Sequence, residues 1–470
     1  MSLLGKIWKI KNQDPKLSIS EKILANRGLI SPEEIDKFFK LSYKKGMHNP
    51  FLMKGMESAV NRIKKAIQNE ERMMIFGDYD VDGISGTAIL YHSLKLRGAK
   101  VSYRLPHRVE HGYGLNNDFI DEFEKLDVKL LVTVDCGISC KEQIKYAKEK
   151  NIDVIITDHH TIPEEFPDDA YAILHPNQPG CDYPFKGLTG AGVAYKLATA
   201  LIKDHFDTKL REQYVHDLLD LASLGTVADL GPLVGENRII VKYGLDALQN
   251  TRWQGLNYLK NLAGIEPTDK LDINTIGFRL GPRINAAGRI DDPYYALQLL
   301  LQDTDDEKAK TLAEHLDNLN TKRQKMVLDA LEQLEERLQT REKKNQIIVA
   351  WDKDWHVGIL GLLAAKCVEK YNVPAIIMQD FGDYLVGSSR GPEWFNLVEA
   401  LTKHSDLLEN FGGHIQAAGF TIPKSRVEQF NAKMKAYAHA IIENTDWRPT
   451  LEIDAEIKEE EIEEGLMLLL

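Results

Sequence analysis

The sequence predicts an α/β protein in which a parallel-sheet domain is joined by a long helix to a smaller α/β domain. Three observations support this class. Short apolar runs alternate with helical segments of roughly a dozen residues between residues 72 and 160, as βα units require. A second alternation of this kind begins at residue 345. Between them, residues 305–341 keep a helical apolar pattern without Gly or Pro, which indicates a rigid connector helix.

Length and composition indicate a globular protein of two or three domains. The chain has 470 residues, of which 43% are hydrophobic and 28% charged. The net charge of −12 argues against a protein that coats nucleic acid generally, although a local basic groove is compatible with it. The four cysteines are too few for a disulfide framework and predict a reducing compartment. Without a signal-like N-terminus or a membrane-spanning run, we expect a cytoplasmic protein with no membrane contact.

The N-terminal part is expected to be helical. Residues 1–50 read as a lead-in, in which Ser31 begins a helix with Pro32 at its first position. Residues 51–70 continue as an amphipathic helix, because apolar side chains recur there at helical spacing.

The stretch MMIFGDYDVDG, residues 73–83, is the most informative part of the chain. A buried strand is followed by Asp78, Asp80 and Asp82 at alternate positions, which in an extended segment would place three carboxylates on one face. Such carboxylates repel one another unless cations lie between them, and Mg²⁺ or Mn²⁺ prefers oxygen ligands. A polar turn is the simplest alternative. An EF-hand loop is a second, but it requires Glu where the chain has Ile89.

Two further apolar runs end in residues that commonly bind metals. Within residues 129–137 the apolar run ends at Asp135. Within residues 151–160 it ends at Asp158, His159 and His160. In a parallel sheet the carboxyl ends of the strands share one edge, where open α/β sheets bind ligands. We therefore expect these residues to form one metal site with the first aspartates. The alternative is that each of them caps a helix or lies in a turn independently.

The remaining segments add candidate carboxylates and phosphate contacts. Residues 188–250 are predicted helical and contain Asp220 and Asp229. Residues 278–292 carry Arg279, Arg283 and Arg289 among glycines, which suits either a phosphate contact or an ordinary surface loop. In the second α/β unit, strands are expected at 345–352, 375–378 and 384–388, with helices at 357–371 and 396–409. Its stretches 387–391 and 411–420 suggest a substrate-facing surface or tight turns.

Six stretches together resemble the DHH phosphoesterases, and most closely their RecJ family of bacterial single-strand-specific 5′→3′ exonucleases. The resemblance extends over nearly the whole chain. It rests on GDYDVDG (77–83), PHRVEHGYGLN (106–116), ITDHH (156–160), LASLGTVADL (221–230), RINAAGRID (283–291) and GGHIQAAGF (412–420).

The resemblance implies a domain plan. Residues 1–50 would form the lead-in, 51–300 the DHH domain, 301–342 the connector helix and 343–446 the DHH-associated domain. Residues 447–470 would begin an incomplete OB-type region. The expected substrate contacts face the metals across a groove between the two domains.

The resemblance also implies residue roles and two cofactor ions, Mn²⁺ or Mg²⁺. Asp78 and Asp80 would hold one ion, Asp82 and His159 the other, and Asp135 would bridge them. Asp220 fits the fourth family motif best, with Asp229 as the alternative. The expected catalytic residues are Asp80, Asp82, Asp135, His159 and His160. The expected contacts to DNA phosphates are Arg108, Arg279, Ser388, Arg390 and His414.

The implied activity is hydrolysis of single-stranded DNA from its 5′ end to mononucleotides, in DNA repair and recombination. A helicase and a single-strand-binding protein are candidate protein partners. One alternative is a DHH-family phosphodiesterase that acts on short oligonucleotides or cyclic dinucleotides. Another is a non-catalytic scaffold of the same fold.

Overall fold

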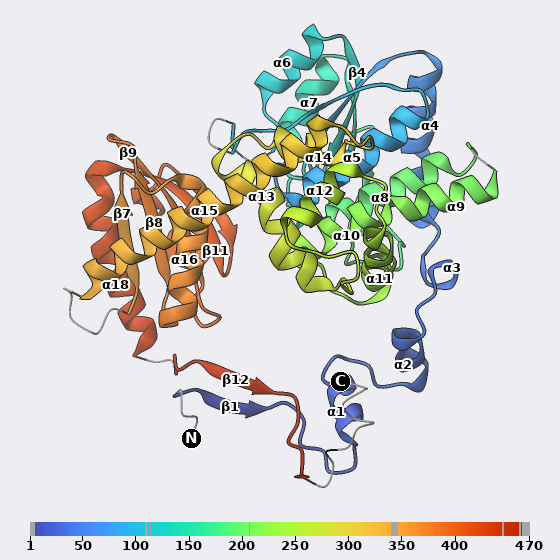
Figure 1. The fold of residues 1–470 in the computed structure, drawn as a ribbon. Helices are drawn as coiled ribbons and strands as arrows, with labels where there is room; N and C mark the ends of the chain where they lie inside the picture. Colours follow the sequence, from blue (N-terminus) through green and yellow to red (C-terminus); the bar gives the residue numbers. More distant parts are fainter. Residues whose placement is uncertain are drawn as a thin grey trace. The chain divides into compact units, whose positions relative to one another are not determined.

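The computed structural model describes residues 5–108, 111–112, 114–205, 207–339, 346–443, 446–459 and 462 (Figure 1). The chain divides into two compact units, residues 42–325 and residues 1–41 together with 326–470. Helix α15 (Glu307–Gln339) extends from the first unit into the second, close to the predicted connector 305–341. Among the described residues, no helix combines the length and the apolar composition that crossing a membrane requires.

The unit of residues 42–325 is built on a five-stranded parallel sheet. Its strands are β2 (Arg72–Gly77), β3 (Lys100–Arg104), β4 (Val128–Val134), β5 (Asp153–Thr157) and β6 (Ala172–Leu174). Its helical elements are α3 (Tyr43–Gly46), η1 (Pro50–Leu52), α4 (Met56–Gln68), α5 (Val81–Leu96), α6 (Asn117–Lys125), α7 (Lys141–Glu149), α8 (Gly190–Ile202), α9 (Thr208–Asp217), α10 (Leu219–Ala228), α11 (Gly235–Gln249), α12 (Gln254–Leu262), η2 (Thr275–Leu280), α13 (Gly281–Ile290) and α14 (Tyr294–Leu300).

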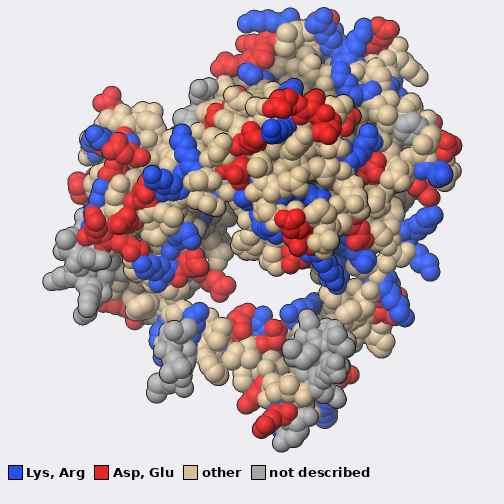
Figure 2. Space-filling view, in the orientation of Figure 1, with Lys and Arg blue, Asp and Glu red and all other residues tan. Residues whose placement is uncertain are grey.

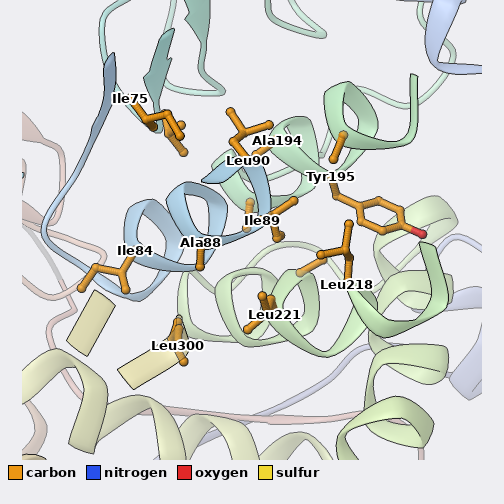
Figure 3. Close-up of a cluster of buried hydrophobic side chains, with 14 of the residues drawn as sticks. Ile75, Ile84, Ala88, Ile89, Leu90, Ala194, Tyr195, Leu218, Leu221 and Leu300 are labelled. Atoms are coloured by element: carbon orange, nitrogen blue, oxygen red, sulfur yellow. The ribbon is translucent and has the colours of Figure 1, made fainter. Parts of the chain in front are cut away.

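Both faces of this sheet are covered, which explains why its strands read as continuous apolar runs. Along β2, Met73 and Ile75 belong to the core beneath α5 and α8, whereas Met74 and Phe76 belong to the core beneath α6 and α7. This alternation is the two-residue period of a strand. Figure 3 shows the first core, where Ile75 lies with side chains from α5, α8, α10 and α14.

The strand order places a crevice at the centre of the sheet. The order is β3-β2-β4-β5-β6, so the chain leaves β2 toward one side and returns through β4 on the other. Ligands of open α/β sheets bind at the carboxyl ends of the strands where the order reverses in this way. Here that point lies after β2 and β4, where the sequence has Asp78 and Asp135.

A buried ion pair fixes α8 against α11. Lys196 Nζ lies 2.8 Å from Glu236 Oε1, and both side chains are almost fully buried. Tyr183 donates its hydroxyl to Glu236 Oε2 (2.6 Å), and Lys196 donates to the carbonyl of His48 (2.6 Å). Because the first residues of α8 contact the cluster described below, this pair helps to hold in place the helix that carries them.

Replacing Glu236 by Gln is expected to lower the free energy of unfolding by about 3 kcal/mol, because it leaves the buried Lys196 without a counter-charge. Urea denaturation measures the loss. Glu33→Gln, which removes one partner of the exposed pair with Lys37, is the matched control and should change little. Equal effects of the two substitutions would contradict the role given to burial.

The second unit contains a five-stranded mixed sheet and a separate two-stranded sheet. The mixed sheet has the order β10-β11-β9-β8-β7, and β1 pairs with β12 in parallel. The strands are β1 (Ile7–Ile10), β7 (Ile348–Asp352), β8 (Ala375–Asp380), β9 (Tyr384–Arg390), β10 (Asn410–His414), β11 (Ala417–Pro423) and β12 (Thr450–Ile453). The helical elements are α1 (Ile19–Ala25), α2 (Pro32–Phe39), α16 (Val357–Tyr371), α17 (Leu397–Thr402), η3 (Ser405–Leu407), η4 (Lys424–Arg426) and α18 (Val427–Ile442).

Several local expectations needed correction. The lead-in is not wholly helical, because β1 pairs with β12 near the other end of the chain. Residues 278–292 form the end of η2 and helix α13 rather than a loop. The expected helix 396–409 ends at Thr402 and continues as a short 3₁₀ turn. The start of α2 is as predicted, since Ser31 and Glu34 form a capping box.

Candidate metal centre

Asp78, Asp80 and Asp82 reach one place by a different route from the one expected. The strand ends at Gly77, and Asp80 caps α5 by accepting from the backbone N–H groups of Asp82 (2.9 Å) and Gly83 (3.2 Å). Asp82 therefore lies in the first helical turn rather than in an extended segment. The three aspartates therefore come together because the chain turns from a strand into a helix, and not because they alternate along an extended segment.

Asp82 is held by the N-terminus of α8. Its Oδ2 accepts from the backbone N–H of Gly190 (2.6 Å) and its Oδ1 from that of Ala191 (2.9 Å). The first N–H groups of a helix have no partner within the helix and favour negative charge. The carboxylate, which is 1% exposed, is thus fixed in orientation.

The DHH triplet is organised by its buried aspartate. Asp158 Oδ1 accepts from the backbone N–H groups of His159 (2.7 Å) and His160 (3.1 Å) and lies 2.8 Å from His160 Nδ1. Its Oδ2 accepts from the backbone of Ile138 (3.0 Å). Since the carboxylate is an acceptor, Nδ1 of His160 is the donor in their contact. Asp158 therefore positions both histidines and is not available as a metal ligand itself.

The candidate ligands form two groups that meet at Asp135. Within each group the possible ligand atoms lie within 4.8 Å of one another: Asp78, Asp80 and Asp135 in one, and Asp82, His159 and Asp229 in the other. Asp135 Oδ1 is 3.1 Å from His159 Nε2 and so connects them. Asp78 and Asp80 thus lie in one group and Asp82 in the other, and the ion that each of them holds stays a prediction. A third combination, Asp135 with both histidines, uses the His160 nitrogen that already contacts Asp158.

The structure corrects the choice of Asp220 over Asp229. Asp220 Oδ1 accepts from Trp253 Nε1 (2.9 Å) and Oδ2 from the hydroxyl of Thr251 (2.5 Å), so its carboxylate is engaged inside the helical core. Asp229 follows α10 and lies 3.7 Å from His159 Nε2, with 32% of its side chain exposed. The two aspartates are at opposite ends of α10, which the linear motif could not distinguish.

Asp229→Asn is expected to weaken Mn²⁺ binding by roughly 10- to 100-fold, the loss typical of altering a group close to a metal. Asp220→Asn should leave Mn²⁺ affinity unchanged and lower the free energy of unfolding by about 1 kcal/mol, because one acceptor oxygen becomes a donor. Isothermal titration with Mn²⁺ and urea denaturation separate the two effects. Loss of Mn²⁺ binding only in the Asp220 variant would restore the first choice.

The electrostatics of the cluster favour bound cations. Burial and the charge of Asp80 raise the pKa of Asp78 well above its usual value, and burial with the neighbouring aspartates does the same for Asp135. Burial, then Asp82 and Asp80, raise the pKa of Asp229 to about 8. Asp78 Oδ1 and His159 Nε2 are buried atoms that form no hydrogen bond with any described residue. Buried acceptors beside mutually repelling carboxylates fit divalent cations.

The surroundings of His160 favour its protonated form. Burial opposes its protonation, but the hydrogen bond to Asp158 and the charge of that carboxylate outweigh burial and raise the pKa of His160 to about 9. His175 supports the same segment, because its Nε2 lies 2.7 Å from the His160 carbonyl while its Nδ1 accepts from Asn177 N–H. His175 was not predicted, and a histidine after a strand offers no distinctive signal.

Two glycines that were not among the predicted site residues make room for the carboxylates. A Cβ at Gly190 would lie 2.5 Å from the Asp135 carboxylate, and one at Gly225 would lie 2.4 Å from Asp82 Oδ1. Both distances are shorter than van der Waals contact, so helices α8 and α10 approach the cluster only because these residues lack side chains. The run LTGAG, where α8 begins, was the available signal.

Arg108 and Arg279, two of the predicted phosphate contacts, both make contacts within the protein. The Arg108 guanidinium lies over the Tyr79 ring at 4.1 Å, and its Nε donates to the Gly288 carbonyl. Residues 109, 110 and 113 of the same motif are outside the described residues. Arg279 donates Nε and Nη2 to carbonyls after α12, so a phosphate contact stays a prediction only for its remaining nitrogen.

The other predicted phosphate contacts lie in the second unit. Ser388 and Arg390 are two residues apart on β9, and Arg390 Nη1 lies 3.4 Å from Ser388 Oγ. A Cβ at Gly361 of α16 would lie 2.9 Å from Arg390 Nη2, so this glycine accommodates the pair. His414 ends the exposed strand β10 of a hairpin. The predicted groove opposite the metals stays a prediction.

The sequence was compared with protein families and with known proteins. Residues 72–226 match the DHH family, N-terminal domain, and residues 344–440 match the DHHA1 domain. The single-stranded-DNA-specific exonuclease RecJ of Bacillus subtilis (strain 168) is 38% identical over 460 residues, which are 95% of this chain and 57% of that protein. RecJ of Salmonella typhimurium is 35% identical over 429 residues, 88% of this chain and 73% of that protein.

A solved structure of a RecJ protein is also similar to this chain. The crystal structure of exonuclease RecJ bound to manganese is 34% identical, with a TM-score of 0.73, and the match covers 84% of this chain and 98% of that one. The present chain spans little more than half the length of the Bacillus relative. The shared domains, the identity over most of the chain and the common fold show that this chain belongs to the RecJ family.

Proposed function

We propose that the protein is a metal-dependent 5′→3′ exonuclease that releases mononucleotides from single-stranded DNA, in DNA repair and recombination. One observation carries the proposal. Two groups of three possible metal ligands lie side by side, joined by the contact between Asp135 and His159, and this arrangement suits a pair of cations rather than one. The relatives named as single-stranded-DNA-specific exonucleases support the substrate.

We assign Asp78, Asp80 and Asp135 to one cation, and Asp82, His159 and Asp229 to the other, with Asp135 contributing to both. The mixture of carboxylates and an imidazole favours Mn²⁺ over Mg²⁺, and a RecJ relative was crystallised with manganese. When bound, such a pair of cations lowers the pKa of an attacking water and neutralises charge that develops on the phosphate.

The chain's own residues fix the geometry around the scissile phosphate. The α8 N-terminus holds Asp82 in one orientation, and Asp158 does the same for both histidines. Protonated His160 adds a positive charge beside the position of the phosphate and would stabilise its transition state. Arg108 binds a neighbouring phosphate, with its guanidinium plane set by Tyr79.

Strand binding is expected to depend on phosphate charge and not on sequence. On the face shown in Figure 2, basic and acidic side chains are interspersed, so contacts with the strand are local. Arg108, Arg279, Ser388 and Arg390 are the proposed phosphate contacts, including the contact to the terminal 5′ group, and His414 is proposed to face the strand. Phosphate contacts carry no sequence information, and affinity should fall with salt.

End-labelled strands test the proposal. With Mn²⁺, a 5′-labelled single strand should release labelled mononucleotide at once, and a 3′-labelled strand should shorten progressively from its other end. A duplex without overhang should be resistant. Release from the 3′ end would refute the polarity. Hydrolysis confined to dinucleotides or cyclic dinucleotides would favour the short-substrate alternative, and no hydrolysis with Mn²⁺ bound would favour a scaffold.

We further propose a cytoplasmic location, which is supported by four free and buried cysteines. A helicase that supplies single strands and a single-strand-binding protein are the proposed protein partners. Co-purification of the tagged chain with either protein, in the presence of nuclease that removes bridging DNA, tests this pairing.

A further inference from the structure

Leu230 has an unusual conformation one residue after the candidate ligand Asp229. Its φ is +58°, and it is the only apolar residue with positive φ among the non-glycine residues described. It occupies the C′ position of a Schellman motif, in which Gly231 N–H donates to the Thr226 carbonyl and Leu230 N–H to that of Val227. Glycine is the usual residue there, because a branched side chain is strained at positive φ.

Packing does not account for this leucine. Its side chain is 88% exposed, the largest value among the exposed large hydrophobic residues of the described chain. In a Schellman motif the supporting apolar contact is made by the residues at C″ and C3, not at C′. Leu230 thus combines backbone strain with an exposed apolar surface, and the folded state gains little from either. Strain of this kind, held beside a candidate catalytic centre, points to a function.

We propose that Leu230 contacts the apolar face of an unpaired nucleotide next to the scissile phosphate and so helps to select single strands. The inference rests on the proposed exonuclease function and adds a residue that reads the unpaired state of a base. Asp229, directly before it, lies 3.7 Å from His159, which places Leu230 at the border of the metal centre. A paired base has its faces covered by neighbouring base pairs, so an apolar contact of this kind favours an unstacked nucleotide.

The test uses the full chain with Mn²⁺ and four variants. Leu230→Gly removes the side chain and the strain. Leu230→Asn introduces a polar residue that tolerates positive φ, and Leu230→Met retains an apolar surface. Leu210→Asn on α9 is the matched control, because Leu210 is also exposed (57%). Each protein is assayed on a single strand and on the same strand with two abasic 5′ nucleotides. Strand affinity is also measured by anisotropy without turnover.

For Leu230→Gly and Leu230→Asn we expect unchanged Mn²⁺ affinity, unchanged or higher thermal stability, and a KM raised roughly five- to tenfold on the normal strand only. The preference of the wild type for bases over abasic sites should disappear. Leu230→Met and Leu210→Asn should behave as the wild type. Normal KM in the Gly and Asn variants, or lower kcat with weaker Mn²⁺ binding, would overturn the inference.

The binding measurement separates this inference from the proposed function. If the wild type releases no nucleotides yet prefers a base-bearing strand, and Leu230→Gly loses that preference, the function fails and the contact stands. If the wild type hydrolyses both strands equally, the function stands and the contact fails. A wild type that binds neither strand overturns both.

Discussion

Asp135→Asn should reduce strand hydrolysis by roughly 10³-fold or more, equivalent to about 4 kcal/mol of transition-state stabilisation, while the protein stays folded. Asp135 belongs to one candidate metal group, and its Oδ1 lies 3.1 Å from His159 Nε2 of the other, so it is the residue proposed to contact both cations. Asparagine removes the negative charge next to both proposed cations. The backbone φ of +61° is tolerated by Asn as well as Asp, so the substitution adds little strain.

The measurement is single-turnover hydrolysis of a 5′-labelled strand, together with strand affinity and Mn²⁺ titration. Strand affinity should change little, because the proposed phosphate contacts are arginines and a serine. Asp127→Asn is a matched control, since Asp127 also has positive φ (+56°) but is exposed and pairs with Lys129 at the opposite end of β4. Hydrolysis in the Asp135 variant at more than about a tenth of the wild-type rate would refute a bridging role.

The parts of the fold and site predicted from sequence are those governed by short-range patterns. Buried parallel strands read as apolar runs, and the polar residues that follow them must share one edge of the sheet. This reasoning placed Asp78, Asp135 and His159 at one edge of the sheet, and Asp135 does lie close to both of the others. It required no knowledge of how the strands are ordered.

Prediction failed where the outcome depends on which atoms other elements supply. Asp220 and Asp229 lie at the two ends of α10, and only the positions of Thr251 and Trp253 show that Asp220 is engaged elsewhere. The carbonyls after α12 that accept from Arg279 were likewise not foreseeable from the sequence around it. The pairing of β1 with β12 joins strands of four residues from distant parts of the chain, which no local pattern reveals.

Without metal, the free energy of unfolding is expected to fall as the pH rises from about 4, the unfolded pKa of aspartate, to about 9. Burial raises the pKa of Asp220 to about 7, and burial with neighbouring carboxylates raises that of Asp229 to about 8. Asp158 raises the pKa of His160 to about 9, against the effect of burial. Each of these values lies above that of the unfolded chain, so the folded state binds the protons more tightly.

This difference in pKa sets the direction in which the free energy of unfolding changes with pH. A group whose pKa is raised by folding contributes its full stability below its unfolded pKa and loses that contribution as the pH rises through the folded value. The slope is about 1.4 kcal/mol per pH unit for each group that titrates between the two values. Urea denaturation in EDTA at intervals across this range measures it. Asp229→Asn should reduce the slope between about pH 4 and pH 8, and Asp220→Asn should reduce it between about pH 4 and pH 7.

Adding Mn²⁺ should weaken or reverse this pH dependence, because cation binding requires ionised carboxylates and releases their protons. The Asp220 contribution should persist with Mn²⁺, since its carboxylate contacts Thr251 and Trp253 and not the cluster. The difference between the two profiles therefore isolates the metal centre from other buried acids. A flat profile in EDTA would show that these carboxylates are not strained without cations. Identical profiles with and without Mn²⁺ would show that the cluster does not bind the metal at all.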